Sequence, residues 1–294
     1  MPTLGSSELI LNPDGSIYHL NLLPEDIATT IITVGDQNRV TEVSKYFDSI
    51  EIKKSKREFV THTGYYKGNR ITVISTGIGT DNIDITFNEL DALANIDFRT
   101  RQIKAEKKRL NFIRVGTSGS IQPDIPIDSF LMSTYGIGFD GLMHFYASGQ
   151  VRDLELEEQL QTYLGWGQYN IHPYAVEANG DLVEIFSSNR IRYGATGTNS
   201  GFYGPQGRSL RLQTQITDFN EKLAAFRFQN QRITNLEMET AAMYGLSKML
   251  GHRAISLNVI LANRATLEFS KKGHQSIDAL IQYTLEKINE KHLV

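Results

Sequence analysis

The chain has 294 residues, of which 40% are hydrophobic, so it can bury a large core, and we expect one domain over residues 1–294. It has no cysteine and a formal net charge of −3, which excludes disulfides, thiolate catalysis and cysteine-based metal sites and argues against nucleic-acid or membrane partners. Because no segment has the pattern of a secretory signal or a membrane span, we expect a soluble, cytoplasmic protein that binds a small molecule.

Short β-rich runs alternate along the chain with stretches of helical spacing. The runs predict strands over 29–34, 71–76, 111–115 and 254–262, the first three followed directly by glycine. The spacing of apolar residues predicts helices over 83–94, 156–164, 242–250 and 276–288, the third closed by Gly251. This alternation is typical of an α/β fold with a central mixed β-sheet flanked by helices. Ligands of such sheets bind beyond the carboxyl ends of the strands, where the glycine turns are expected.

The first glycine turn reads GDQNR, with Gly35 after a strand and Arg39 where a helix is expected to begin. Glycine lets backbone N–H groups approach an anion, and a helix N-terminus and a guanidinium add positive charge. The turn therefore predicts a phosphate site. It lacks the patterns GxxxxGK[ST] and GxGxxG, which disfavours nucleoside triphosphates and dinucleotides.

The second turn, RVGTSGS, predicts Arg114 at the end of a strand with Thr117 and Ser118 on a loop. One glycine-rich strand end is usually only a tight turn, but two that carry arginine favour an anion site.

Further along, Glu237 and Glu239 flank Met238 directly before a predicted helix. Acidic residues there can simply complement the helix dipole. Alternatively, a carboxylate can accept hydrogen bonds from adjacent sugar hydroxyls while the thioether packs against the sugar ring.

The stretch NSGFYGPQGR (199–208) places aromatic and polar side chains among glycines and a proline. It is either a solvated surface loop or a binding loop. In the second case Phe202 offers an apolar face, Gln206 both donates and accepts, and Arg208 supplies a fork of donors. Such a set can hold a flat, polar heterocycle.

Eight short motifs carry a resemblance to a known family. They are YHL (18–20), GDQNR (35–39), REF (57–59), STGIG (75–79), RVGTSGSIQP (114–123), FYGPQGR (202–208), EMET (237–240) and ANR (262–264). In this order they make the chain resemble the nucleoside phosphorylases of the purine/uridine phosphorylase type. The resemblance implies the nucleoside phosphorylase fold and reversible phosphorolysis. The expected substrates are phosphate and uridine, with 2′-deoxyuridine or thymidine as further nucleosides, and the products are uracil and ribose 1-phosphate.

The resemblance also implies roles for individual residues. Phosphate would be held by Gly35, Arg39, Arg114 and Thr117, with Arg57 from a neighbouring subunit. Ribose would contact Met238 and Glu239, with His19 from the same neighbour. The base would contact Ser118, Gly119, Phe202, Gln206, Arg208 and Arg264. Arg114, Glu239, Gln206 and Arg208 would be the catalytic residues, and the shared sites imply a homo-oligomer of at least two chains.

Three alternatives remain at this point. A purine nucleoside phosphorylase of the related bacterial type would have an aspartate at the position of Asn263 to protonate the purine. A hydrolytic nucleosidase would not need the cluster of Arg39, Arg57 and Arg114, and a binding protein could keep the fold without catalysis. We expect no cofactor and no catalytic metal. A potassium ion at the subunit interface, near Glu58, stays open because Asn82 stands where the family has a small hydroxyl residue.

Overall fold

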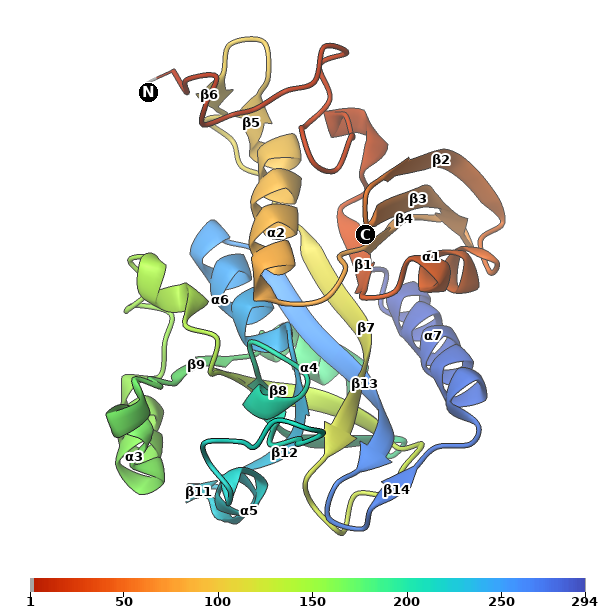
Figure 1. The fold of residues 1–294 in the computed structure, drawn as a ribbon. Helices are drawn as coiled ribbons and strands as arrows, with labels where there is room; N and C mark the ends of the chain where they lie inside the picture. Colours follow the sequence, from red (N-terminus) through yellow and green to blue (C-terminus); the bar gives the residue numbers. More distant parts are fainter. Residues whose placement is uncertain (1–2, 294) are drawn as a thin grey trace.

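The computed structural model describes residues 3–293, in which twelve strands form one continuous sheet (Figure 1). The strands of this sheet are β1 (Thr30–Val34), β2 (Ser49–Lys56), β3 (Phe59–Tyr66), β4 (Asn69–Ser75), β7 (Asn111–Ser120), β8 (Phe130–Gly138), β9 (Tyr174–Glu177), β10 (Ile191–Thr198), β11 (Arg227–Phe228), β12 (Gln231–Glu237), β13 (Arg253–Asn263) and β14 (Glu268–Phe269). They pair in the order β11-β12-β10-β8-β13-β7-β1-β4-β3-β2, with β9 on β8 and β14 on β13. A separate hairpin joins β5 (Ile96–Asp97) to β6 (Gln102–Ile103).

Part of the sheet closes on itself. β7 runs parallel to β1 and β13, and β10 runs parallel to β8 and β12, whereas β13 and β8 are antiparallel. β12 also pairs with the end of β7, Asn235 opposite Ser120 and Leu236 opposite Gly119. Five strands therefore form a barrel-like ring, from which β1, β4, β3 and β2 extend. The predicted α/β fold with a mixed sheet is confirmed, and the ring closure is an addition that the sequence did not reveal.

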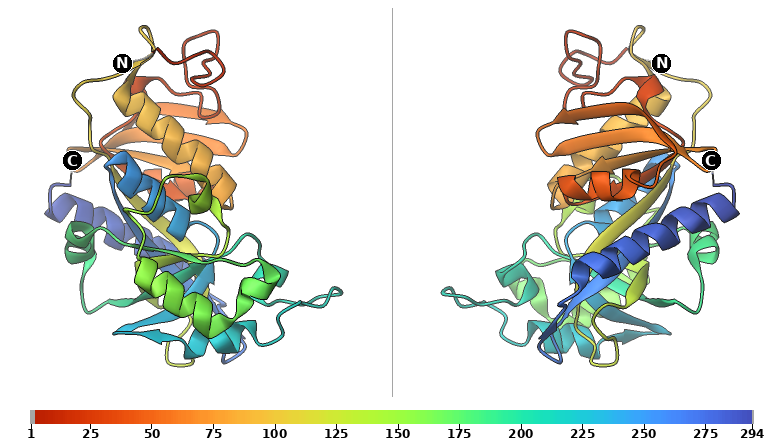
Figure 2. Two further views of the ribbon diagram at one scale, coloured as in Figure 1. Left: turned by 90° about the vertical axis from the view of Figure 1, so that its left-hand side faces the viewer. Right: turned by 90° about the vertical axis from the view of Figure 1, so that its right-hand side faces the viewer.

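Helices cover the sheet on both sides (Figures 1 and 2). They are α1 (Gln37–Ser44), α2 (Thr80–Asn95), α3 (Leu154–Leu164), α4 (Gly180–Phe186), α5 (Phe219–Ala225), α6 (Thr240–Leu250) and α7 (Gly273–Glu290). α2 packs beside α6 on one side of β7 and β13, and α1 packs beside α7 on the other. No helix within residues 3–293 is long and apolar enough to cross a membrane.

The predicted elements agree with the structure except at one strand end. The four helices form α2, α3, α6 and α7, and Gly251 closes α6 with a φ of +80°. The strand expected to end at residue 115 continues to Ser120, so the prediction of a turn at Gly116 was wrong. β7 continues because β13 pairs with it as far as Ser120 and β12 joins at Gly119 and Ser120.

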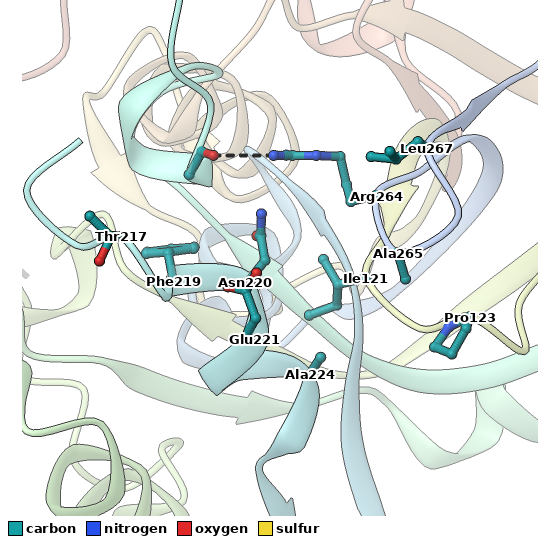
Figure 3. A pocket seen from close by; sticks show the side chains of 11 residues that line it. Ile121, Pro123, Thr217, Phe219, Asn220, Glu221, Ala224, Arg264, Ala265 and Leu267 are labelled. Carbon is teal, nitrogen blue, oxygen red and sulfur yellow. Dashed lines mark hydrogen bonds between the residues drawn. The ribbon is translucent and has the colours of Figure 1, made fainter. Parts of the chain in front are cut away.

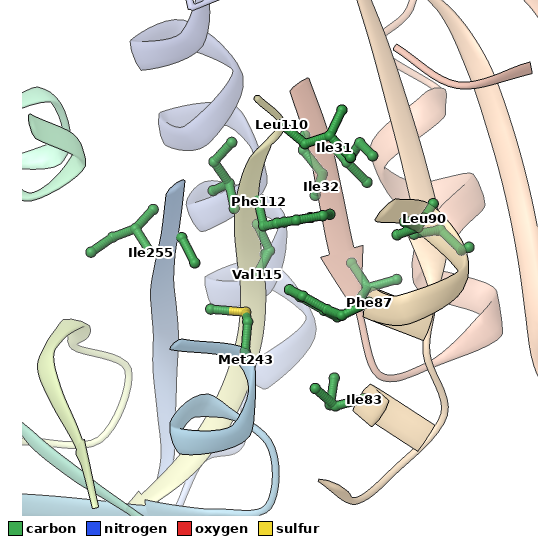
Figure 4. Packing of buried hydrophobic residues seen from close by; sticks show 14 of the residues in the cluster. Ile31, Ile32, Ile83, Phe87, Leu90, Leu110, Phe112, Val115, Met243 and Ile255 are labelled. Carbon is green, nitrogen blue, oxygen red and sulfur yellow. The ribbon is translucent and has the colours of Figure 1, made fainter. Parts of the chain in front are cut away.

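The buried core holds α2 against β1 and β7 (Figure 4). The rings of Phe87 on α2 and Phe112 on β7 have centroids 4.3 Å apart, and both side chains are fully buried. Leu90 and Ile31 belong to the same core. Because each such side chain contributes about 1.5–3 kcal/mol by burial, this packing fixes α2 relative to β7. The candidate site lies at that junction.

Candidate active site

Two glycine turns meet where β1 and β4 end. Thr76 N donates to Val34 O at 2.8 Å, which holds the two strand ends together. A side chain added at Gly35 would come within 3.5 Å of the carbonyl oxygen of Gly77. The turns are therefore in contact, and their backbones line one edge of the site.

Arg39 lies at the start of α1, as predicted. Asp36 caps the helix by accepting a hydrogen bond from Asn38 N at 2.9 Å, and Arg39 Nη1 donates to Val115 O at 3.3 Å. Arg39 Nε is buried and has no hydrogen-bond partner among residues 3–293. Burial, and next the nearby charge of Arg114, lower the pKa of Arg39. A second cation close by and an unused buried donor are what an anion site requires.

Arg114 is the buried cation at the centre of the site, and only 6% of it is exposed. Nη2 donates to Glu239 and lies 3.5 Å from Glu237 Oε2, while Nη1 donates to Asn258 at 2.9 Å. Burial by itself disfavours the charge, but Glu239 and Glu237 together raise the pKa of Arg114 above its usual value.

The two glutamates before α6 have different surroundings. Glu237 accepts from the backbone N–H groups of Glu239 and Thr240 and from the hydroxyls of Thr198 and Thr240. It therefore serves the helix start, the simpler of the two roles considered. Burial, and to a smaller extent Glu239, raise its pKa to about 7. Glu239 instead accepts from Gly79 N at 2.9 Å and from Arg114, so it joins the turn before α2 to the buried arginine. Met238, between them, is half-buried.

Residues 116–119 of β7 form what we call the β7 floor. Arg114 was expected at a strand end with Thr117 and Ser118 on a loop, but all three lie inside β7. The guanidinium of Arg114 lies over Gly116, where an added Cβ would be 1.7 Å from Nη1. At the other end, Arg208 Nη2 would lie 3.7 Å from a Cβ added at Gly119. The two arginines thus reach opposite ends of the floor, roughly 10 Å apart along the strand.

Ser118, within the floor, is buried and accepts a hydrogen bond from Asn235 Nδ2 at 2.8 Å. Thr117 is half-buried beside it. The sequence did not single out Asn235, which ties this part of β7 to β12 where the ring of strands closes.

The loop that carries Gln206 and Arg208 is held by its own side chains. Gln206 ends a short helix (Gly204–Gln206) and is 2% exposed. Arg208 Nη1 donates to Gln206 Oε1 at 2.6 Å and to Phe202 O at 2.7 Å, and its guanidinium lies 3.9 Å from the centre of the Phe202 ring. Arg264 Nη1 donates to Gln206 O at 3.0 Å. The structure therefore brings Phe202, Gln206, Arg208 and Arg264 together, as predicted.

Neither Arg208 nor Arg264 forms an ion pair with a carboxylate within residues 3–293. Burial, and next the charge of Arg264, lower the pKa of Arg208 to about 10. Half-buried donors without a counter-ion suit a ligand that presents carbonyl oxygens or develops negative charge.

A cavity of about 410 Å³ lies behind this loop (Figure 3). Arg264 reaches across it to the carbonyl oxygen of Gly207 at 3.2 Å, and Ile121 and Phe219 supply apolar walls. The cavity adjoins the loop that carries Gln206 and Arg208 but is not lined by the predicted phosphate residues.

Asn263, the buried last residue of β13, is committed to the backbone. Its Nδ2 donates to Gln122 O and Ile125 O at 2.9 and 2.8 Å, and its Oδ1 accepts from Ala265 N and Thr266 N. All of its amide groups are used to shape the turn after β13.

His19 and Arg57 lie on neighbouring segments. His19 Nδ1 is 2.6 Å from Glu89 Oε1 on α2, and Leu20 N donates to the same carboxylate. Lys56, directly before Arg57, donates to Tyr18 O and to Asn12 Oδ1. Arg57 is exposed at the tip of the β2–β3 hairpin, and its backbone carbonyl accepts from Gln37 Nε2 at 3.0 Å. These two residues thus belong to one connected surface near the start of α1.

Several site residues were not found from the sequence. Asn258 could have been noticed as a polar residue within an apolar strand run, and Gly79 belongs to the motif STGIG. Glu89 gives no local signal, because its partner is 70 residues away in the chain.

Residues 3–293 contain no group of three or more His, Asp or Glu side chains placed to share a metal ion. Glu58 and Asn82 both approach Gly77, within 3.1 and 2.4 Å of a Cβ added there.

Comparisons with known proteins identify the family of this chain. A sequence profile described as phosphorylase superfamily matches residues 29–288. The chain belongs to the phosphorylase superfamily. Among members of the superfamily, uridine phosphorylase of Thermococcus kodakarensis is 32% identical over 275 residues, which covers 92% of this chain and 86% of that one. Uridine phosphorylase of Haemophilus influenzae is 29% identical over 273 residues, covering 92% and 93%. A solved structure of a Trypanosoma brucei nucleoside phosphorylase, described as showing uridine phosphorylase activity, matches with a TM-score of 0.86 at 29% identity, covering 96% and 100%.

Proposed function

We propose that this member of the phosphorylase superfamily is a uridine phosphorylase, a pentosyltransferase that converts uridine and phosphate reversibly to uracil and ribose 1-phosphate. The observation that carries the proposal is the β7 floor, with the cations Arg39 and Arg114 at one end and Arg208 with Gln206 at the other. Glu239 accepts from Arg114 at the phosphate end. Anion, sugar and base can therefore lie in that order along one strand. The relatives named uridine phosphorylase support this assignment.

At the phosphate end, Arg39, Arg114, Thr117 and the backbone of Gly35 would hold phosphate. The unused Nε of Arg39 is a donor available for it. A phosphate oxygen attacks C1′ of ribose as the bond from C1′ to N1 of uracil breaks. The phosphate charge stabilises the positive charge that develops on the sugar, and no covalent enzyme intermediate is required.

At the base end, the electron pair of the breaking bond passes to uracil. Gln206 and Arg208, with Arg264 behind them, would donate to the carbonyl oxygens where this negative charge appears. Phe202 and Gly119 would line the ring, and Met238 and Glu239 the ribose. The hydrogen phosphate dianion gives up one proton as it becomes the ester dianion ribose 1-phosphate, and the base takes up one proton and leaves as neutral uracil.

The alternatives receive less support. A purine phosphorylase would need an acid near the base, and Asn263 is neutral and has its amide bonded to four backbone groups. A hydrolytic nucleosidase would have no use for the cationic pair of Arg39 and Arg114.

In the same proposal the protein is cytoplasmic and at least dimeric, with His19 and Arg57 reaching a neighbour's site. Lys56, which precedes Arg57, donates to the carbonyl oxygen of Tyr18, which precedes His19, and this link between the two segments supports a joint role. Phosphate is a co-substrate and no cofactor takes part. Assays with and without potassium would show whether a monovalent cation acts near Glu58 and Asn82.

The direct test is release of uracil from uridine by the purified protein, with and without phosphate. Phosphate-dependent release together with formation of ribose 1-phosphate supports the proposal. Release of free ribose at the same rate without phosphate would instead assign a nucleosidase.

A further inference from the structure

The side chain of Arg114 reaches Asn258 by passing over Gly116, two residues further along its own strand. An added Cβ at Gly116 would lie 2.5 Å from Cζ and 1.7 Å from Nη1 of Arg114. Only a residue without a side chain allows this path. The end of the path is Asn258, whose Oδ1 accepts from Nη1 at 2.9 Å.

Asn258 is placed for this contact by the sheet itself. It lies on β13 directly opposite Gly116, while Ser256 lies opposite Arg114. Asn258 is fully buried, and its Nδ2 donates to Ser256 Oγ at 3.2 Å. Ser256 Oγ in turn lies 2.9 Å from Thr240 Oγ1 at the start of α6. These contacts orient the amide with its oxygen toward Arg114 and its nitrogen away from it.

Asn258 is neutral, so it accepts from Arg114 without adding a negative charge beside it. Arg114 already faces two carboxylates, Glu239 and Glu237, on its Nη2 side. Arg39 and Arg114 supply two positive charges here, which the two carboxylates can at most balance. A third carboxylate on the Nη1 side would make the group net negative at the place where a phosphate anion must bind. An amide oxygen holds the same geometry without that charge.

We propose that Asn258 is a positioning residue that aligns Arg114 for phosphate without adding negative charge to the site. This inference rests on the proposed function for the role of phosphate, and it adds a residue outside the motifs quoted above. Asn258 acts through Arg114 and does not itself touch the substrate.

The test is the substitution Asn258→Asp, which keeps the size of the side chain and adds a charge. We expect the KM for phosphate at neutral pH to rise at least about tenfold, with a change of less than about twofold in the KM for uridine. The loss should diminish as the pH is lowered and the new carboxyl group takes up a proton. Asn258→Ala should lower kcat at all pH values, because it leaves Nη1 of Arg114 without its acceptor.

Asn111→Asp is the matched control. Asn111 is another buried asparagine whose Oδ1 accepts from an arginine, Arg253 Nε at 2.7 Å. It is the first residue of β7, at the other end of that strand from the β7 floor. The control should leave the KM for phosphate unchanged. Equal effects of the two substitutions, or no change in the phosphate KM of Asn258→Asp, would overturn the proposal.

Calorimetric titration of the folded parent and Asn258→Asp proteins with inorganic phosphate gives a second readout that does not depend on turnover. Weaker binding by the variant supports the role of Asn258 even if the parent cleaves no uridine, in which case only the proposed function fails. Equal binding by parent and variant contradicts the positioning role whatever nucleoside is cleaved.

Discussion

Glu89 fixes the ring of His19: its Oε1 lies 2.6 Å from Nδ1, and the same carboxylate accepts from the backbone N–H of His19. An ionised carboxylate can only accept, so Nδ1 carries the proton and Nε2 is left for other contacts. The ring is therefore oriented by α2 although His19 belongs to the N-terminal segment.

The substitution Glu89→Gln is expected to raise the KM for uridine by about threefold to tenfold, because it removes a charged acceptor that orients His19. Steady-state kinetics measure this. Asp91→Asn is the control, since Asp91 on the same helix contacts a different histidine, His252, at 3.0 Å. If the two variants show the same KM as the parent, His19 has no part in ribose binding.

Gly116→Ala should lower kcat/KM by more than about a hundredfold while the protein still folds, because the new methyl group occupies the path of Arg114. Gly180→Ala is the control, because Gly180 lies outside the site at the start of α4 and an added Cβ there meets no atom within 4 Å. Kinetics and circular dichroism of both variants check this. A Gly116→Ala enzyme as active as Gly180→Ala would contradict the described position of Arg114.

Arg114→Ala should reduce turnover more than Arg57→Ala. Removing a charged hydrogen bond from a closed site costs about 1.5–3 kcal/mol, or about tenfold to more than a hundredfold in rate. Arg57 is exposed at a hairpin tip, so water can replace part of its contribution. Rates of both variants at saturating uridine test the order. Equal, small losses would count against the assignment of phosphate residues.

Glu237 predicts a pH-dependent contribution to stability. Burial raises its pKa in the folded protein to about 7, from an ordinary value of 4.5. The folded state therefore holds the proton more tightly, and the stability from this group is complete below the ordinary pKa and lost as the pH rises through about 7. In thermal melts, the Tm of the parent minus the Tm of Glu237→Gln should fall as the pH rises over this window, because only the parent carries the titrating group. A value of this difference that rises with pH has the wrong sign for this account.

The sequence predicted the local features and the residue types of the site. Arg39 follows a strand and a glycine, and Glu239 precedes a helix, so short patterns were enough to identify them. The turn predicted at Gly116 was wrong because glycine inside a strand gives the same local signal as glycine in a turn, and only the pairing of β7 with β13 and β12 separates them. Glu89 could not be found, since its partner is distant in the chain. Asn258 stands out as a polar residue in an apolar strand, but its contact with Arg114 is long-range and gives no local signal.

Under the proposed function, the choice of base would follow from Gln206 and Arg208. The edge of uracil presents a carbonyl, an N–H and a second carbonyl, which these two side chains can match. Cytosine has an acceptor in place of the N–H and an amino group in place of one carbonyl, so it would leave buried polar groups unpaired. Sites of this kind reject such analogues by on the order of 10⁴.

The most direct measurement is phosphorolysis of uridine, cytidine and inosine under the same conditions, with phosphate present and absent, by the parent and by Gln206→Ala. The parent should cleave uridine only with phosphate and refuse cytidine, and inosine should react poorly because Asn263 supplies no proton to a purine. Gln206→Ala should lose most of its activity on uridine. A parent enzyme that prefers inosine, or that cleaves uridine equally well without phosphate, would contradict the assignment.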